Sequence, residues 1–377
     1  MALILNEEQE LLRDSAHDFL AEHSPVQALR ALRDAGEDWS PALWQEMAEM
    51  GWTGIAVPED FGGLGFGYVG AGLVLEQCGR TLLSSPLLSS TLVCTALIER
   101  LGDPGQKAAL LPGLASGETI MTLAVKEGPR LDPAAIALSA RADGDGYRLN
   151  GNKAGVLDAR MAQRMLVVAR TGGEPGEQEG LSVFVVDGHA RGLVAEHTLN
   201  LDNHQSTQLT FSDVQLGPEA CLGEPGQAWA AVQHALDIGA IGASAELQGL
   251  AREAFERTMD YLKERKQFGV PIGSFQALQH RAAELFTELE LCRALVLRAL
   301  QALDDADDDL SLLASAAKAR CGDAARLAVN EAVQMHGGIG MTDEYDIGFF
   351  MKRAAAARQE YGDSYYHANR FAAIRGY

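Results

Sequence analysis

The chain has 377 residues, of which 47% are apolar, and its formal net charge is −21 at pH 7. This length is sufficient for two or three domains with sizeable cores. The acidic balance argues against nucleic acid and against anionic membrane surfaces as partners, because like charges repel. No apolar run approaches the roughly 20 residues that a membrane span requires. The N-terminal residues also lack the basic and apolar regions of a signal peptide.

The five cysteines form no Cys-x-x-Cys pair, and the nine histidines are scattered without ligand spacing. This pattern predicts reduced, mostly buried thiols in a cytoplasmic protein. It also predicts no metal site.

Residues 1–118 are expected to form a helical domain. Asn6 is placed to cap a first amphipathic helix, and Ser40-Pro41 opens another helix. Between residues 119 and 220 the pattern changes to short β-prone runs separated by turns rich in glycine and aspartate. We expect these runs to form an antiparallel β domain of barrel or sandwich type. The predicted fold class is therefore α+β.

Residues 221–377 are again expected to be helical, as a bundle of four or more helices. An acidic cluster in this region, Asp304–Asp309, is expected to be a solvated loop between two helices.

Within this bundle, the stretch RKQFGVPIGSFQALQ (residues 265–279) separates two long helical patterns. Gly269, Pro271 and Gly273 require the chain to turn there, which places Arg265 and Phe268 where the first helix ends. An exposed arginine and an aromatic side chain can bind a phosphate and a flat ring, respectively. The alternative is a solvated helix end with one anchoring phenylalanine.

Three motifs together resemble the acyl-CoA dehydrogenase family. They are R-x-x-F-G-x-x-I-x-x-F-Q at residues 265–276, QMHGGIGMTDEYD at 334–346 and V-P-E-x-x-G-G-x-G at 57–65. The resemblance implies an N-terminal helical domain, a middle β domain and a C-terminal helical bundle. It also implies FAD as cofactor, an acyl-CoA substrate and an electron-transfer flavoprotein as electron acceptor.

The resemblance further implies which residues bind the cofactor. In the family the arginine and the phenylalanine of the first motif reach across a dimer interface to the FAD of the neighbouring subunit. The glutamine and glycines of the second motif are similar to further contacts with that FAD, although a glycine-rich helix end explains them equally well. The expected cofactor-binding residues are Arg265, Gln267, Phe268, Gln276, Gln334, Gly337 and Gly338.

The loops that would surround the chain's own FAD depart from the family pattern. Where the family has T-E-P-x-x-G-S-D, residues 125–133 read VKEGPRLDP and keep only Glu127 and Asp132. Where the family has an aromatic residue followed by x-T, this chain has Gly155 and Leu157. The side-chain hydroxyl donors to the isoalloxazine are therefore missing.

Dehydrogenation of an acyl thioester requires a carboxylate that removes the α-proton. Most family members carry this glutamate just before a glycine, where this chain has Tyr361 followed by Gly362, and Glu360 lies one residue earlier. A minority carry it at the position of Gly239. Glu246 lies seven residues further along that helix in a small, apolar setting, where burial would raise its pKa.

The sequence favours Glu246 over Glu360 as the base, and Asp363 is a third option. The competing interpretation of Glu246 is a solvated residue or a helix–helix ion pair.

The leading functional hypothesis is an FAD-dependent acyl-CoA dehydrogenase of fatty acid or steroid catabolism, assembled as a tetramer. The chain keeps the residues that serve a neighbour's FAD and departs at those that serve its own. A subunit of a hetero-oligomer, completing the site of a related partner chain, would show this pattern. The remaining alternatives are a catalytically silent structural subunit and an oxygen-using relative such as a nitroalkane oxidase or flavin monooxygenase.

Overall fold

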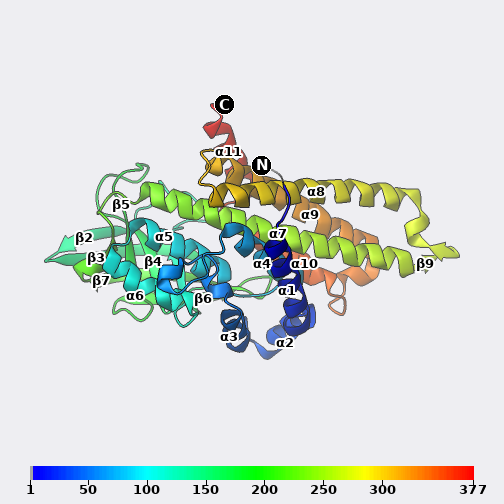
Figure 1. Cartoon of the computed structure of the whole chain (residues 1–377), viewed down its shortest axis with the longest axis horizontal. Coiled ribbons are helices and arrows are strands. Elements are labelled where there is room, and N and C mark those ends of the chain that lie inside the picture. Colours follow the sequence, from blue (N-terminus) through cyan, green and yellow to red (C-terminus); the bar gives the residue numbers. More distant parts are fainter. Residues whose placement is uncertain (1–2) are drawn as a thin grey trace. The chain divides into compact units, whose positions relative to one another are not determined.

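The computed structural model describes residues 3–377, which divide into two compact units (Figure 1). The first unit contains the residues up to Glu37, together with Tyr68–Ser84 and Ala240–Tyr377. The second unit contains Asp38–Gly67 and Ser85–Gly239. Helix α7 (Trp229–Glu264) carries the chain from the second unit into the first.

The first unit is helical. Besides the C-terminal part of α7, it contains α1 (Glu7–His23), α2 (Val26–Ala35), α4 (Tyr68–Thr81), α8 (Gln276–Asp304), α9 (Leu310–His336), α10 (Ile347–Ala357) and α11 (Ser364–Ile374). The predicted start of α1 is confirmed, because the Asn6 side chain accepts from the Gln9 N–H at 2.8 Å while the Gln9 side chain accepts from the Asn6 N–H. Such a capping box satisfies two backbone donors that a helix start otherwise leaves unpaired.

Helices α4 and α7 pack with their backbones in close contact. A Cβ atom added at Gly249 would lie 1.8 Å from the backbone oxygen of Glu76, and one added at Gly79 would lie 2.1 Å from that of Glu246. Neither position therefore has space for a side chain. This crossing fixes where Glu76 on α4 and Glu246 on α7 lie within the unit.

The acidic cluster after α8 differs from its prediction in one respect. The Asp304 carboxylate accepts hydrogen bonds from the backbone N–H groups of Tyr68 and Val69, at 2.6 and 3.0 Å. Asp304 therefore caps the start of α4, as a carboxylate at a helix N-terminus does. Asp307 pairs with Arg298, and Asp305, Asp308 and Asp309 belong to the loop that joins α8 to α9.

The second unit combines a sheet with short helices. The helices are α3 (Pro41–Glu49), α5 (Thr95–Leu101), α6 (Pro104–Ala115) and a π-helical segment, Leu87–Cys94. The strands are β1 (Met121–Ala124), β2 (Ser139–Asp143), β3 (Gly146–Leu157), β4 (Arg164–Arg170), β5 (Leu181–Asp187), β6 (Leu193–Leu199), β7 (Gln205–Leu216) and β8 (Cys221–Leu222). As predicted, Ser40 caps α3 by accepting from the Leu43 N–H.

The strand order is β6-β7-β3-β2-β4-β5-β8, and β1 pairs with β4. Buried side chains from these strands form one apolar core that includes Leu149, Val167 and Phe184. The α+β fold class predicted from the sequence is confirmed, with helices before and after a β segment. The sheet is mixed, however, because β1 runs parallel to β4 and a single residue pair joins β2 to β4 in parallel.

The boundaries proposed near residues 118 and 220 remain a prediction. Within residues 3–377, no helix is long and apolar enough to cross a membrane.

Candidate active site

The predicted turn between α7 and α8 is a small, exposed hairpin. Strands β9 (Lys266–Gln267) and β10 (Val270–Pro271) pair antiparallel across Phe268 and Gly269, which both adopt positive φ angles, +54° and +82°. Positive φ is unusual for a residue with a side chain. The hairpin nevertheless places the Phe268 side chain outward, so that it is 92% exposed.

The polar residues predicted to bind the cofactor from this hairpin are also exposed. The Arg265 guanidinium forms no hydrogen bond or ion pair with any residue between 3 and 377, although its backbone accepts from the Ile272 N–H. Gln267 donates only to the neighbouring backbone oxygen of Lys266. Gln276, the first residue of α8, is exposed as well. The hairpin therefore offers a guanidinium and an aromatic ring to a group outside the unit.

The second predicted stretch lies at the end of α9, next to the start of this hairpin. The Tyr261 ring stacks on His336 with 4.3 Å between ring centroids, and the Tyr261 hydroxyl donates to the His336 backbone oxygen. The backbone N–H of Arg265 in turn donates to the oxygen of Tyr261. Tyr261 thus links the two motifs, which are far apart in the sequence.

At this helix end, Gln334, Gly337 and Gly338 are exposed. No atom lies within 4 Å of a Cβ added at either glycine, so a ligand has space to approach their backbone. The His336 Nδ1–H donates to the Ala332 oxygen, whereas the buried Nε2 has no hydrogen-bond partner in the described chain. Burial lowers the pKa of His336, which favours the neutral ring.

The FAD implied by the resemblance can be compared with these groups. An unpaired guanidinium suits a diphosphate, an exposed aromatic ring suits adenine, and open glycine backbone suits close approach of a ligand. The seven residues fit a cofactor that reaches them from outside the unit. Their role in binding remains a prediction.

The two carboxylates favoured as bases meet at one arginine. Arg353 on α10 contacts Glu246 through Nε at 2.7 Å and through Nη2 at 2.6 Å. Its Nη1 donates to Glu360 at 2.8 Å. The side chains of Arg353, Glu246 and Glu360 are only 6%, 9% and 11% exposed. One buried arginine therefore faces two carboxylates, and the buried Lys318 also interacts electrostatically with Glu360.

Sequence reasoning located both carboxylates but missed the arginine that joins them. Arg353 is separated from Glu246 by 107 residues, so no local spacing connects the two. The ion pair considered for Glu246 is present, and Glu360 shares it. The structure thus brings the two candidate bases together.

The turn that follows Glu360 is held by buried side chains. Lys318, which is 0% exposed, donates to the backbone oxygens of Arg358 and Gly362 at 3.0 and 2.8 Å. Burial lowers the pKa of Lys318 to about 8. His367 Nε2–H donates to the oxygen of Tyr361, whose φ is +52°. These contacts stabilise an unusual backbone directly after Glu360.

Asp363, the third option for the base, caps α11 by accepting from the Tyr366 N–H at 2.8 Å. Its carboxylate therefore already has a structural partner.

In the second unit, the loops expected around the chain's own FAD are joined to each other. Glu127 accepts from the N–H groups of Ala137 and Leu138 and from Lys153, which is 0% exposed. A Cβ atom added at Gly155 would lie 2.9 Å from the Lys126 amine. Lys126 would therefore have to move to accommodate the family's aromatic residue at this position.

Within the described part of the chain, no group of three or more His, Cys, Asp or Glu residues is arranged to hold a metal ion. The predicted state of the five cysteines is confirmed, because all are free and buried.

Three family models match the chain. They are described as the N-terminal, middle and C-terminal domains of acyl-CoA dehydrogenase and cover residues 6–118, 126–214 and 226–374. Among curated relatives, Acyl-CoA dehydrogenase FadE12 of Mycobacterium tuberculosis is 31% identical over 368 residues, or 95% of this chain and 93% of the relative. Cyclohex-1-ene-1-carbonyl-CoA dehydrogenase of Syntrophus aciditrophicus is 30% identical over 93% of this chain and 85% of its own length.

Among solved structures, a variant of the Tcur3481–Tcur3483 steroid ACAD is 32% identical with a TM-score of 0.88, covering 98% of both chains.

Proposed function

This chain belongs to the acyl-CoA dehydrogenase family and is an oxidoreductase with FAD as its cofactor, and we propose that it oxidises an acyl-CoA thioester to the 2,3-enoyl-CoA. Electrons would then pass to an electron-transfer flavoprotein. The proposal includes a cytoplasmic location, which the free, buried cysteines support. The acyl group would be a fatty acyl or steroid side chain.

The observation that carries the proposal is the buried cluster of Glu246, Arg353 and Glu360. Two buried carboxylates share one arginine, which holds both candidate proton acceptors in defined positions. Removal of the α-proton of a thioester needs such a carboxylate. We propose Glu246 for this step, with Glu360 as the alternative. Bound FAD would accept the hydride that leaves the β-carbon.

Arg353 would then act as a positioning residue. It holds the Glu246 oxygen through two nitrogens, which fixes the direction of the carboxylate. Protonation of Glu246 would weaken its ion pair and leave Arg353 with Glu360.

Cofactor binding is assigned to the exposed set at the ends of α7 and α9. Arg265 would bind the diphosphate, Phe268 would pack against the adenine, and the exposed helix end at Gln334 and Gly338 would supply further polar contacts. Gln267, Gln276 and Gly337 lie in the same two stretches. Because these groups point away from their own unit, the FAD that they bind would belong to a neighbouring subunit, as in a tetramer.

A second candidate function is a subunit that completes the site of a related partner chain without forming one of its own. Two observations favour it. Both candidate bases are tied to Arg353, and Gly155 and Leu157 offer no side-chain hydroxyl to a flavin. The steroid ACAD that resembles this chain is named for two components, Tcur3481 and Tcur3483.

The deciding experiment is to purify the protein alone and to record its flavin absorbance together with its native mass. About one FAD per chain in a homotetramer supports the complete enzyme. A colourless protein that takes up FAD only with a second subunit supports the second candidate. A flavin that is reduced by a substrate and rapidly reoxidised by air would instead indicate an oxygen-using relative.

For a yellow protein, anaerobic mixing with acyl-CoA tests the base directly. We expect Glu246→Gln to slow flavin bleaching at least a hundredfold, because the α-proton has no acceptor. Glu99→Gln, at a half-buried glutamate in the second unit, is the matched control. Unchanged bleaching in Glu246→Gln with loss in Glu360→Gln would assign the base to Glu360.

A further inference from the structure

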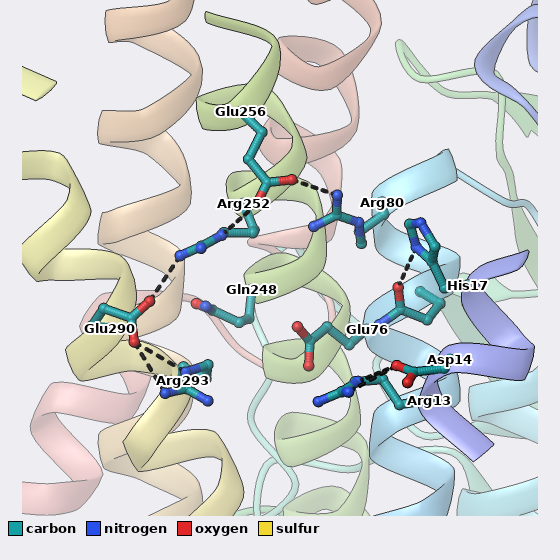
Figure 2. Close-up of a pocket in the computed structure, with 11 residues that line it drawn as sticks. Arg13, Asp14, His17, Glu76, Arg80, Gln248, Arg252, Glu256, Glu290 and Arg293 are labelled. Atoms are coloured by element: carbon teal, nitrogen blue, oxygen red, sulfur yellow. Dashed lines mark hydrogen bonds and ion pairs between the residues drawn. The ribbon is translucent and has the colours of Figure 1, made fainter. Parts of the chain in front are cut away.

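A polar pocket lies among four helices of the first unit (Figure 2). Its volume is about 500 Å³, within the usual range for small-ligand sites. Side chains from α1, α4, α7 and α8 line it. None of the residues assigned to the cofactor or to proton removal is among them, so the proposed function does not account for this pocket.

Four arginines surround the pocket, and each already has an acidic partner. Figure 2 shows these pairs as dashed lines. They are Arg13 with Asp14 at 2.8 Å, Arg80 with Glu256 at 2.6 Å, Arg252 with Glu290 at 2.8 Å and Arg293 with Glu290 at 3.1 Å. Arg252 and Arg293 share Glu290, so in these pairs the four arginines contact three acids.

Glu76 is different from the other acids of the wall. Its carboxylate forms no hydrogen bond or ion pair with residues 3–377, although the four arginines are near enough to act on it electrostatically. In the view of Figure 2 it extends from α4 into the space between Gln248 and Arg13. Burial raises the pKa of Glu76, because desolvation disfavours the ionised form, while the charges of the four nearby arginines oppose this effect. The pocket therefore contains one acid that makes no direct contact with a cation of the described chain.

Gln248 supplies a second acceptor atom that lacks a hydrogen-bond donor in the described chain. The residue is 2% exposed and lines the same pocket. Its Nε2 donates to the Leu289 oxygen at 3.1 Å, but its buried Oε1 has no partner within residues 3–377. An unsatisfied buried acceptor costs about 1–3 kcal/mol. A ligand that brings N–H donors would remove that penalty.

We propose that this pocket binds a small amphoteric molecule, with its ammonium group at Glu76 and its carboxylate at Arg13 and Arg293. Gln248 Oε1 is a further acceptor for the ammonium. The side chains of Arg13 and Arg293 are 37% and 62% exposed, so they retain N–H donors toward solvent at the pocket mouth. A simple cation would leave these donors unused, and a simple anion would leave Glu76 without a partner.

The test is calorimetric titration of the purified holoprotein with ε-aminocaproate. Hexylamine and caproate, which each carry one of its two charges, are the matched probes. We expect ε-aminocaproate to bind at least tenfold more tightly than either probe.

Variants locate the site. Glu76→Gln should weaken ε-aminocaproate binding at least tenfold, whereas Glu99→Gln in the second unit should leave the affinity unchanged. Arg293→Gln, at a side chain that is 62% exposed, should also weaken ε-aminocaproate binding. Equal binding of caproate, an unchanged affinity in both pocket variants or the absence of any binding would overturn the proposal.

Discussion

Replacing Arg353 with methionine removes the cation that Glu246 and Glu360 share. The change leaves two carboxylates in a setting where their side chains are 9% and 11% exposed. Removing one partner of a buried ion pair typically destabilises a protein by about 3–5 kcal/mol, because the remaining charge is uncompensated. Here two charges lose their partner, so we expect Arg353→Met to destabilise the first unit by at least about 3 kcal/mol.

The assay is thermal unfolding of the holoprotein followed by circular dichroism at several pH values. At about 2 °C per kcal/mol, the expected fall in the midpoint is about 6 °C or more. The loss should be smaller at acidic pH than at neutral pH, since protonation removes the unpaired charges. Lys352→Met, at the adjacent half-buried cation of α10, is the matched control.

A triple variant separates charge from packing. Arg353→Met combined with Glu246→Gln and Glu360→Gln replaces the whole cluster with neutral side chains, so it should recover part of the lost stability. The reasoning is refuted if Arg353→Met unfolds at the same temperature as Lys352→Met. It is also refuted if the triple variant is less stable than Arg353→Met alone.

Two further predictions concern the same unit. Gly249→Ala should destabilise the protein by about 1–3 kcal/mol or more in urea unfolding, because the new methyl group would lie 1.8 Å from the backbone oxygen of Glu76. Gly348→Ala is the control, because no atom lies within 4 Å of the added group, and it should leave the stability unchanged. Equal effects of the two variants would contradict the close contact between the helices. Burial lowers the pKa of His367 to about 3 in the folded protein, compared with an ordinary pKa of 6.5. At pH values between these two, the unfolded chain binds a proton that the folded chain excludes. The free energy of unfolding should therefore fall as the pH is lowered from about 7 to about 4. His367→Gln should flatten this part of the stability profile relative to the exposed His189→Gln, and parallel profiles would contradict the assignment.

Local signals in the sequence predicted local structure well. Asn6 and Ser40 act as helix caps, and the glycines and proline after Arg265 form the expected turn, because each signal depends on residues a few positions apart. Strand β6 has no comparable signal in the sequence. Six of its seven residues are exposed, so neither face of the strand requires apolar residues and the sequence shows no alternation of apolar and polar side chains.

Contacts between distant residues could not be predicted in this way. Asp304 caps α4 although the two are 236 positions apart in the sequence. Arg353 joins Glu246 and Glu360, which were predicted as alternative bases. The prediction that Glu246 lies in a buried, small-residue environment is consistent with its exposure, but only the fold shows its partner. Periodicity identifies which face of a helix is buried. It contains no information on which charged residue of another helix lies opposite.

The shared arginine also decides how the base should be identified. Glu246→Gln and Glu360→Gln are not independent changes, because removing either carboxylate leaves Arg353 fully available to the other. A structural role predicts that the effects on stability are strongly non-additive in the double variant while flavin bleaching by acyl-CoA survives in both single variants. If one of the carboxylates is the catalytic base, its single variant should lose flavin bleaching while its free energy of unfolding stays nearly unchanged. A double-mutant cycle measured for both quantities in the FAD-containing protein therefore separates a catalytic role of these carboxylates from a purely structural one, even though the same three residues are involved in each.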